Sequence, residues 1–173
     1  QVGDVELRPR EGIVRKNGRL HRVSGGGFLL SDLGSGAVVG QAAARQALAA
    51  YQGLIEPSAF TRRIMRRYGN DPSRMLTWAK AATPSRWAEL APLVFAAPDK
   101  DPVARRLVDD AVADVTRLID RMVALGARRI ALVGGLADAY ASRLPRRLAR
   151  VLVPAQHDAL AGAISLARKA NGA

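Results

Sequence analysis

The glycine-rich stretch at residues 25–36 holds the residues best suited to binding chemistry. It carries five of the sixteen glycines and one acidic residue, Asp32. Glycine tolerates positive φ and lets a ligand approach the main chain closely, and a carboxylate accepts hydrogen bonds from hydroxyl groups. The amides of residues 34–36 precede an alanine-rich helical stretch, where unpaired N–H groups favour anionic ligands. The same pattern also fits a plain surface loop that joins a hairpin to a helix.

The second candidate site is the glycine pair Gly134-Gly135. It directly follows residues 129–133, whose aliphatic and β-branched side chains predict a buried strand. Open α/β sheets bind ligands at the carboxyl ends of such strands, where glycines permit main-chain approach. A tight strand-to-helix turn is the alternative interpretation of this pair.

The elements that would position these two sites alternate between strands and helices. Asn17-Gly18 separates two β-capable runs and predicts a hairpin with a type I′ turn, whereas residues 1–11 show no clear period. A short strand is predicted at 150–153. Start signals at Pro57-Ser58, Asp71-Pro72, Thr83-Pro84 and Asp101-Pro102 predict helices over 57–68, 71–80, about 84–94 and 101–125. Further helices are predicted at 37–51, 142–149 and 158–170. The helix at 101–125 has a regular apolar stripe, so we expect it to cover a sheet.

The histidines, the tryptophans and the aspartates of the 101–125 helix are predicted to have structural rather than functional roles. His21 is predicted to be a hairpin side chain, because its neighbours supply no acidic or nucleophilic partner. His157 falls in a connection. Trp78 and Trp87 are predicted to be core residues rather than ligand platforms. The aspartates of the 101–125 helix are predicted to be mostly exposed, and no acidic metal site is expected from them.

The composition favours a single cytoplasmic domain. The chain has 173 residues, of which 49% are hydrophobic and 24% charged, enough to bury a core. The absence of cysteine excludes disulfides and thiolate metal sites within the chain, and two separated histidines argue against zinc. No apolar run approaches the roughly 20 residues of a membrane span, and the first residues lack the features of a signal peptide.

The formal net charge is +12, from 27 Lys and Arg against 15 Asp and Glu. The arginines are spread along predicted helices without interleaved aromatic residues, so a solvated basic face is expected and nucleic acid is not predicted as a partner. Walker-type, zincin and serine hydrolase motifs are absent from the sequence.

The order of the motifs resembles one family. The hairpin, the loop with Asp-x-Gly-Ser-Gly, the long helix, the strand before Gly134-Gly135 and the final Asp-Ala-Leu-Ala-Gly-Ala together resemble the C-terminal part of bacterial N-acetylglucosamine and glucosamine kinases. These kinases are of the BadF/BadG/BcrA/BcrD type, within the actin, hsp70 and hexokinase superfamily. The resemblance extends from about Ile13 to Arg168.

That resemblance implies a helix-rich α/β fold with a ribonuclease H-like (actin-like ATPase) domain, forming one half of a two-domain sugar kinase. Residues 1–36 would then be a hairpin and sugar-loop segment from the end of the N-terminal half. Residues 37–173 would be the C-terminal ribonuclease H-like domain with a helical insertion.

The resemblance also implies roles for individual residues. An amino-sugar pocket would be lined by Gly25, Gly26, Gly27, Asp32 and Gly36. ATP would approach Gly134 and Gly135, with Mg²⁺ carried on its phosphates. The family often has tryptophan where this chain has Gly26 and a polar residue where it has Leu33, so the identity of the sugar stays open.

The family's phosphate loop and its general-base aspartate have no counterpart in residues 1–173. No catalytic residue and no metal ligand is therefore predicted here, and these residues alone are not expected to turn over, because phosphoryl transfer needs both sides of a cleft. One alternative is a non-catalytic sugar-binding homologue, and another is an activator ATPase of the same superfamily. Those activators hold a cysteine-bound cluster, which this cysteine-free chain lacks. A homodimer is left open.

Overall fold

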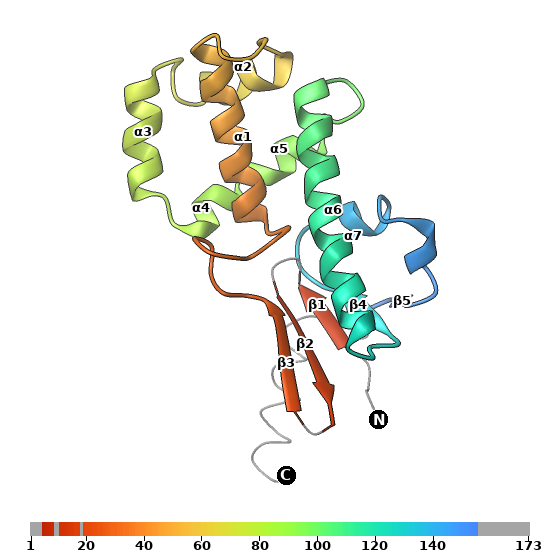
Figure 1. The fold of residues 1–173 in the computed structure, drawn as a ribbon. Coiled ribbons are helices and arrows are strands. Elements are labelled where there is room, and N and C mark those ends of the chain that lie inside the picture. The colour runs from red at the N-terminus through yellow and green to blue at the C-terminus, as the bar shows by residue number, and fades with distance from the viewer. Residues whose placement is uncertain (1–4, 9–10, 18, 156–173) are drawn as a thin grey trace. The chain divides into compact units, whose positions relative to one another are not determined.

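The computed structural model describes residues 5–8, 11–17 and 19–155 (Figure 1). The chain divides into two compact units. The first unit comprises the residues up to 25 and those from 116 onward, and the second comprises residues 26–115. The first unit combines the N-terminal hairpin with strands from the C-terminal part of the chain.

The first unit is built on a five-stranded sheet. Its spatial order is β3-β2-β1-β4-β5, and β2 runs antiparallel to both of its neighbours while β1, β4 and β5 are parallel. The hairpin prediction is confirmed, since β2 and β3 pair directly and Asn17 has the positive φ of 51° that its turn requires. The strands are β1 (Val5–Arg8), β2 (Glu11–Lys16), β3 (Arg19–Ser24), β4 (Ile130–Leu132) and β5 (Leu152–Val153).

Strand β1 corrects the prediction that residues 1–11 lack regular structure. It is only four residues long and has no local signal beyond the alternation of Val5 and Leu7. It forms because β2 pairs with it on one side and β4 on the other. The Leu7 side chain is fully buried, so long-range pairing and burial decide this strand rather than local propensity.

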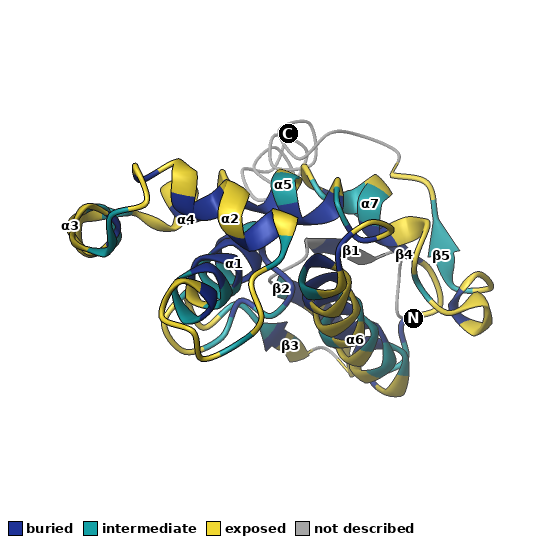
Figure 2. Ribbon diagram, turned by 90° about the horizontal axis from the view of Figure 1, so that it is seen from above, coloured by how far each residue is buried: buried dark blue, intermediate teal, exposed yellow. Residues whose placement is uncertain are grey.

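One face of the sheet packs against the end of helix α6 (Pro102–Ala124). Gly12 on β2 lies so close to this helix that a Cβ atom there would stand 2.6 Å from the Met122 sulfur. Val14 and Ile130 on the same side are fully buried. The apolar stripe predicted for this helix is confirmed, and Figure 2 shows it as a buried band along one side of α6, with exposed residues on the other.

The second unit consists of helices. Helix α1 contacts α2, α4 and α5. The predicted start signals are confirmed, because Ser58, Asp71 and Thr83 each accept a hydrogen bond from a backbone amide of the helix that follows. Besides the first part of α6, the unit contains α1 (Gly36–Tyr51), α2 (Ala59–Arg66), α3 (Pro72–Ala81), α4 (Pro84–Ala88) and α5 (Ala91–Phe95).

Two predicted helices are wrong in detail, both because of proline. The single helix expected at 84–94 is two short helices, since Pro92 has no N–H to donate to the carbonyl four residues earlier. The helix expected at 142–149 is replaced by α7 (Ala137–Ala141) and the 3₁₀ turn η1 (Arg146–Leu148), which are separated by the extended Pro145. The predicted helix at 158–170, and His157 with it, lie outside the described residues.

Candidate functional site

The glycine loop, defined as residues 25–36, turns through several left-handed residues. Gly25, Gly27 and Gly34 have φ of 76°, 91° and 72°. Two residues that are not glycine share this conformation, Ser24 at 63° and Asp32 at 56°. Aspartate accepts left-handed backbone more readily than most residues, because its short side chain can bond to nearby amides. The loop therefore requires glycine or a small polar residue at these positions.

Asp32 is held by the loop around it. Its side chain is buried, with 9% relative exposure, and its Oδ1 atom accepts a hydrogen bond of 3.2 Å from the Gly27 amide. Its carbonyl oxygen accepts from the Ser35 amide at 2.9 Å. A carboxylate has about four lone-pair positions, so one amide bond does not exhaust its capacity to accept further hydrogen bonds.

Helix α1 begins at Gly36, at the C-terminal end of the glycine loop. The hydroxyl of Ser35 caps the helix by accepting from the Val38 amide at 3.2 Å. Gly36 packs against α4, since a Cβ atom there would lie 3.1 Å from the Cβ of Ala88. The predicted alanine-rich helix thus starts within the glycine loop and carries the loop's C-terminal end.

The structure places the predicted sugar-loop residues in two groups. Gly26, Gly27, Asp32 and Gly36 belong to the second unit, and Gly27 and Asp32 are in direct contact. Gly25 belongs to the first unit, where a Cβ atom would lie 2.7 Å from the side chain of Glu11.

Gly134 and Gly135 follow β4 in the first unit, as predicted. The amide of Val133 continues the parallel pairing by donating to the Leu7 carbonyl at 3.0 Å. Gly134 has φ of 111°, and a Cβ atom at Gly135 would meet none of the described residues within 4 Å. The described part of the chain therefore leaves space beside Gly135. It lies at the carboxyl end of the parallel strands β1, β4 and β5, which is the edge where open α/β sheets bind ligands.

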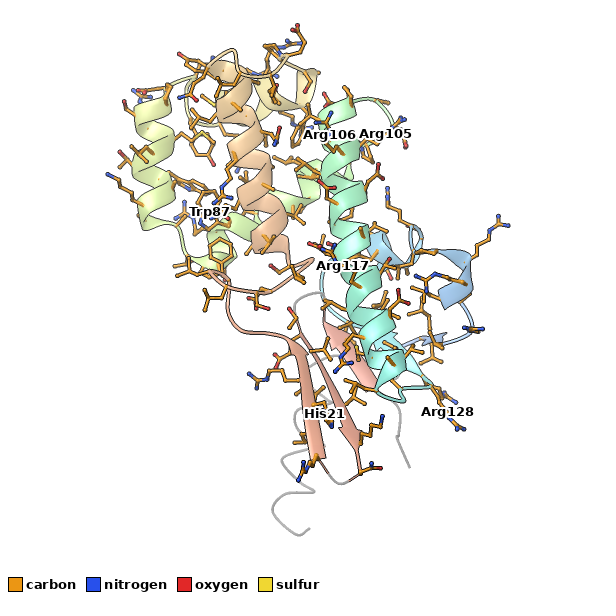
Figure 3. The ribbon with its side chains drawn as sticks, in the orientation of Figure 1. His21, Trp87, Arg105, Arg106, Arg117 and Arg128 are labelled. Carbon is orange, nitrogen blue, oxygen red and sulfur yellow. The ribbon has the colours of Figure 1, made fainter. Side chains whose placement is uncertain are left out.

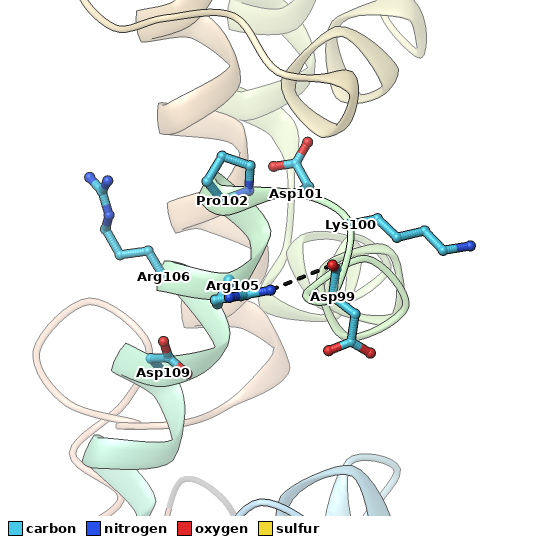
Figure 4. A pocket seen from close by; sticks show the side chains of 7 residues that line it. All are labelled: Asp99, Lys100, Asp101, Pro102, Arg105, Arg106 and Asp109. Atoms are coloured by element: carbon cyan, nitrogen blue, oxygen red, sulfur yellow. Dashed lines mark hydrogen bonds between the residues drawn. The ribbon is translucent and has the colours of Figure 1, made fainter.

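A surface hollow of about 520 Å³ lies at the start of α6, and no predicted site residue lines it (Figure 4). Its buried carboxylate, Asp101, accepts hydrogen bonds from the amides of Phe60, Val103 and Ala104. Burial alone would raise the pKa of Asp101, but these amides together with the Ser58 hydroxyl hold it below its usual value. The side chain of Arg105 is engaged by the carbonyls of Pro98 and Asp99. Asp101 and Arg105 therefore hold the start of α6 and the turn before it in place.

An exposed ion pair joins α6 to the 3₁₀ turn η1 within the first unit. Asp120 on α6 receives two hydrogen bonds from Arg147, of 2.6 and 2.8 Å, in a bidentate arrangement. These bonds lower the pKa of Asp120 and raise that of Arg147.

Among the described residues there is no group of three side chains suited to hold a metal ion, and no helix long and apolar enough to cross a membrane. His21 pairs with Val14 in the hairpin, as expected.

One feature of the loop escaped sequence reasoning. Phe28 stacks against Trp87, with ring centroids 6.5 Å apart and planes inclined by 29°. Trp87 is buried, which confirms the prediction that it is a core residue, and it lies beside the glycine loop (Figure 3). The two rings are separated by 58 intervening residues, so no local pattern indicates their contact.

Comparison with known proteins connects this arrangement to one group. A model of the BadF/BadG/BcrA/BcrD ATPase family matches residues 11–167. The chain is 31% identical, over 159 residues, to the glucosamine kinase GspK of Vibrio cholerae, and the match covers 91% of this chain and 54% of that kinase.

Two crystal structures have similar folds. A presumed N-acetylglucosamine kinase from Chromobacterium violaceum is 34% identical with a TM-score of 0.83, and the match covers 96% of this chain and 59% of the other. A presumed N-acetylglucosamine kinase from Porphyromonas gingivalis is 18% identical with a TM-score of 0.61, over 90% and 57%, and shows similarity of fold alone. The chain therefore spans a little over half the length of the relatives it matches.

Proposed function

Since this chain belongs to the BadF/BadG/BcrA/BcrD ATPase family, we propose that its protein transfers the γ-phosphoryl group of ATP to an amino sugar, N-acetylglucosamine or glucosamine. Residues 1–173 supply the C-terminal half of the cleft in this proposal. The named relatives support the substrate class, because one is a glucosamine kinase and the other two are presumed N-acetylglucosamine kinases.

The observation that carries the proposal is the placement of Asp32. A buried carboxylate in a glycine-rich loop, fixed by the Gly27 amide, suits a ligand with several hydroxyl groups. Asp32 is thus the proposed sugar ligand, accepting hydrogen bonds from hydroxyl groups. Gly27 donates to this carboxylate, and a Cβ atom at Gly27 would meet none of the described residues within 4 Å, so this glycine leaves room for a close approach of the sugar ring. Gly25, Gly26 and Gly36 are the other proposed residues of the sugar loop.

The turn at Gly134-Gly135 is the proposed nucleotide contact. The fit is supported by the open space around Gly135 and by the position of the turn at the carboxyl end of β4. The first unit also carries most of the positive charge of the chain, sixteen Lys and Arg against six Asp and Glu, whereas the second has eleven against nine. Such a field favours the approach of a polyanion such as ATP.

ATP would supply the phosphoryl group, and Mg²⁺ would reach the site on its phosphates, keeping most of its water ligands. This chain's own contribution is binding and orientation: Asp32 orients the sugar, and the Gly134-Gly135 main chain receives the nucleotide. The general base is assigned to none of these residues.

The sheet supports a ribonuclease H-like assignment for the first unit. Its order β3-β2-β1-β4-β5, with β2 antiparallel and β1, β4 and β5 parallel, is the arrangement of that fold. The second unit then corresponds to the helical insertion, because residues 26–115 enter the chain between β3 and β4.

The test is an assay of ATP-dependent phosphorylation of glucosamine, N-acetylglucosamine and glucose, in which the release of ADP is measured. It is applied to the full-length gene product and to residues 1–173. We expect turnover by the full-length protein with one amino sugar, and none by residues 1–173. If the full-length protein binds an amino sugar without turnover, the kinase proposal is wrong and the protein is a non-catalytic sugar-binding homologue. Absence of both binding and turnover in a folded protein would exclude these sugars as ligands.

A further inference from the structure

The tip of the glycine loop is a tight turn with one anchored side chain. The Gly27 carbonyl accepts hydrogen bonds from the amides of Leu30 and Ser31, at 3.1 and 2.8 Å, so residues 28–30 form the apex. Leu29 and Leu30 project outward with 89% and 90% relative exposure. Phe28, in contrast, is half-buried and stacks on Trp87 of α4. Phe28 is therefore the apex side chain that attaches this turn to the helices.

The ring that receives Phe28 is itself firmly held. Trp87 meets Trp78 edge-on, with centroids 4.6 Å apart, and Trp78 contacts Tyr68 at 5.1 Å. The carbonyl of Trp87 lies directly against Gly40 of α1, where a Cβ atom would overlap it. A row of four aromatic rings thus runs from the end of α2 to the glycine loop. The anchor for Phe28 is part of the packed core of the second unit.

Asp32 is coupled to this anchor through a short path. The amide of Gly27 donates to the Asp32 carboxylate, and the carbonyl of the same residue closes the turn that presents Phe28. A displacement of the Phe28 ring from Trp87 therefore moves Gly27, and with it the hydrogen bond that orients the carboxylate.

We propose that Phe28 is a positioning residue for the amino sugar, which acts by stacking on Trp87 and so holds Asp32 in its binding orientation. The inference rests on the proposed function and extends it to a residue outside the proposed ligand set. Because it concerns the orientation of a sugar ligand, it predicts an effect on sugar affinity that is separate from nucleotide affinity and from the chemical step.

The experiment compares Phe28→Ala, Phe28→Tyr and Leu54→Ala in the full-length gene product. Leu54 is an exposed apolar side chain of the same unit, outside the loop and the aromatic row, and serves as the matched control. The KM for the sugar, the KM for ATP and kcat are measured for each variant, together with sugar affinity by calorimetry without ATP. Thermal unfolding establishes that each variant is folded.

We expect Phe28→Ala to raise the sugar KM and the calorimetric Kd by about 3- to 10-fold, the range of an aromatic pair contact. The KM for ATP should stay within twofold of the wild-type value, Phe28→Tyr should restore sugar affinity, and Leu54→Ala should change none of these quantities. An unchanged sugar KM in Phe28→Ala, or an equal rise in both KM values, would overturn the positioning role while leaving the kinase intact. A wild-type protein that neither binds nor phosphorylates an amino sugar would instead overturn the proposed function and this inference with it.

Discussion

The Oδ2 atom of Asp101 accepts a hydrogen bond of 2.8 Å from the amide of Phe60, although the two residues lie 41 positions apart. The other carboxylate oxygen accepts from the amides of Val103 and Ala104, in the first turn of α6. One buried aspartate therefore caps α6 and also satisfies an amide in the first turn of α2. The start of α6 is thereby tied to a helix from another part of the chain.

The first prediction concerns this double cap. Replacing Asp101 with alanine should lower the free energy of unfolding by about 2–4 kcal/mol, because a helix cap is lost and buried amides are left without an acceptor. Urea unfolding of the full-length gene product measures the change. Asp109→Ala is the control, since Asp109 is exposed on the same helix, and it should shift stability by about 0.5 kcal/mol or less. Equal effects of the two substitutions would contradict the cap.

The second prediction is an acid dependence of stability. The pKa of Asp101 and that of Asp120 are lower in the folded protein than in the unfolded chain. Between its folded and unfolded pKa each carboxyl binds fewer protons in the folded state, so stability rises with pH across that interval. The stabilisation should be complete above about pH 4, the unfolded value, and be lost as the pH falls toward the folded values.

Thermal unfolding measured from about pH 2.5 to about pH 7 tests this acid dependence, because that range extends from below the unfolded Asp pKa to well above it. Asp101→Asn should be less stable than the wild type at neutral pH, and its melting temperature should fall less steeply as the pH is lowered. If the melting temperature of Asp101→Asn falls with pH as steeply as that of the wild type, the ionisation of Asp101 does not contribute to stability.

The third prediction separates two roles of Asp32. Asparagine tolerates the left-handed φ of this position and retains a carbonyl oxygen for the Gly27 amide, but it removes the charge. If the carboxylate binds sugar hydroxyls, Asp32→Asn should raise the sugar KM by about 10-fold or more with little change in thermal stability, because hydrogen bonds to charged groups contribute about 1.5–3 kcal/mol. Steady-state kinetics with amino sugar measures the effect. An unchanged sugar KM would restrict Asp32 to shaping the turn.

The fourth prediction tests the nucleotide contact. A Cβ atom at Gly135 meets no neighbour within 4 Å in the part of the chain that the structure describes, so Gly135→Ala should leave the unfolding transition unchanged. If ATP approaches this main chain closely, the same substitution should raise the KM for ATP by about 10-fold, a loss of about 1.4 kcal/mol, while the sugar KM stays constant. Steady-state kinetics with ATP varied at saturating sugar measures the KM for ATP of the variant and of the wild type. A wild-type KM for ATP would remove Gly135 from the proposed contact.

The fifth prediction concerns the packing of α1 on α4. Alanine at Gly40 would drive its Cβ atom into the Trp87 carbonyl, a backbone group that cannot move aside without shifting the helix. Gly40→Ala should therefore lower the free energy of unfolding by about 3 kcal/mol, despite the better helix propensity of alanine. Gln41→Ala, on the neighbouring and half-exposed position, is the control and should be close to neutral. Stabilisation by Gly40→Ala would show that the two helices are not in close contact.

The sequence by itself determined the elements that carry strong local signals. Asn17-Gly18 marked the hairpin, because few residue pairs adopt the positive φ values of its turn. Ser58, Asp71 and Thr83 marked helix starts, because their side chains bond to amides within their own helix. The regular stripe of the 101–125 helix marked its buried side. The glycine loop and the Gly134-Gly135 turn were found in the same way, from residue types that permit main-chain approach.

The tertiary structure alone decided the features that depend on partners distant in the chain. Strand β1 exists because β2 and β4 pair with it, and its four residues contain no sufficient signal of their own. Asp101 resembled an ordinary helix cap, yet its second bond goes to Phe60. The stacking of Phe28 on Trp87 is equally non-local. The physical reason is the same in each case: pairing, burial and ring contacts are relations between separate segments, and only folding brings those segments together.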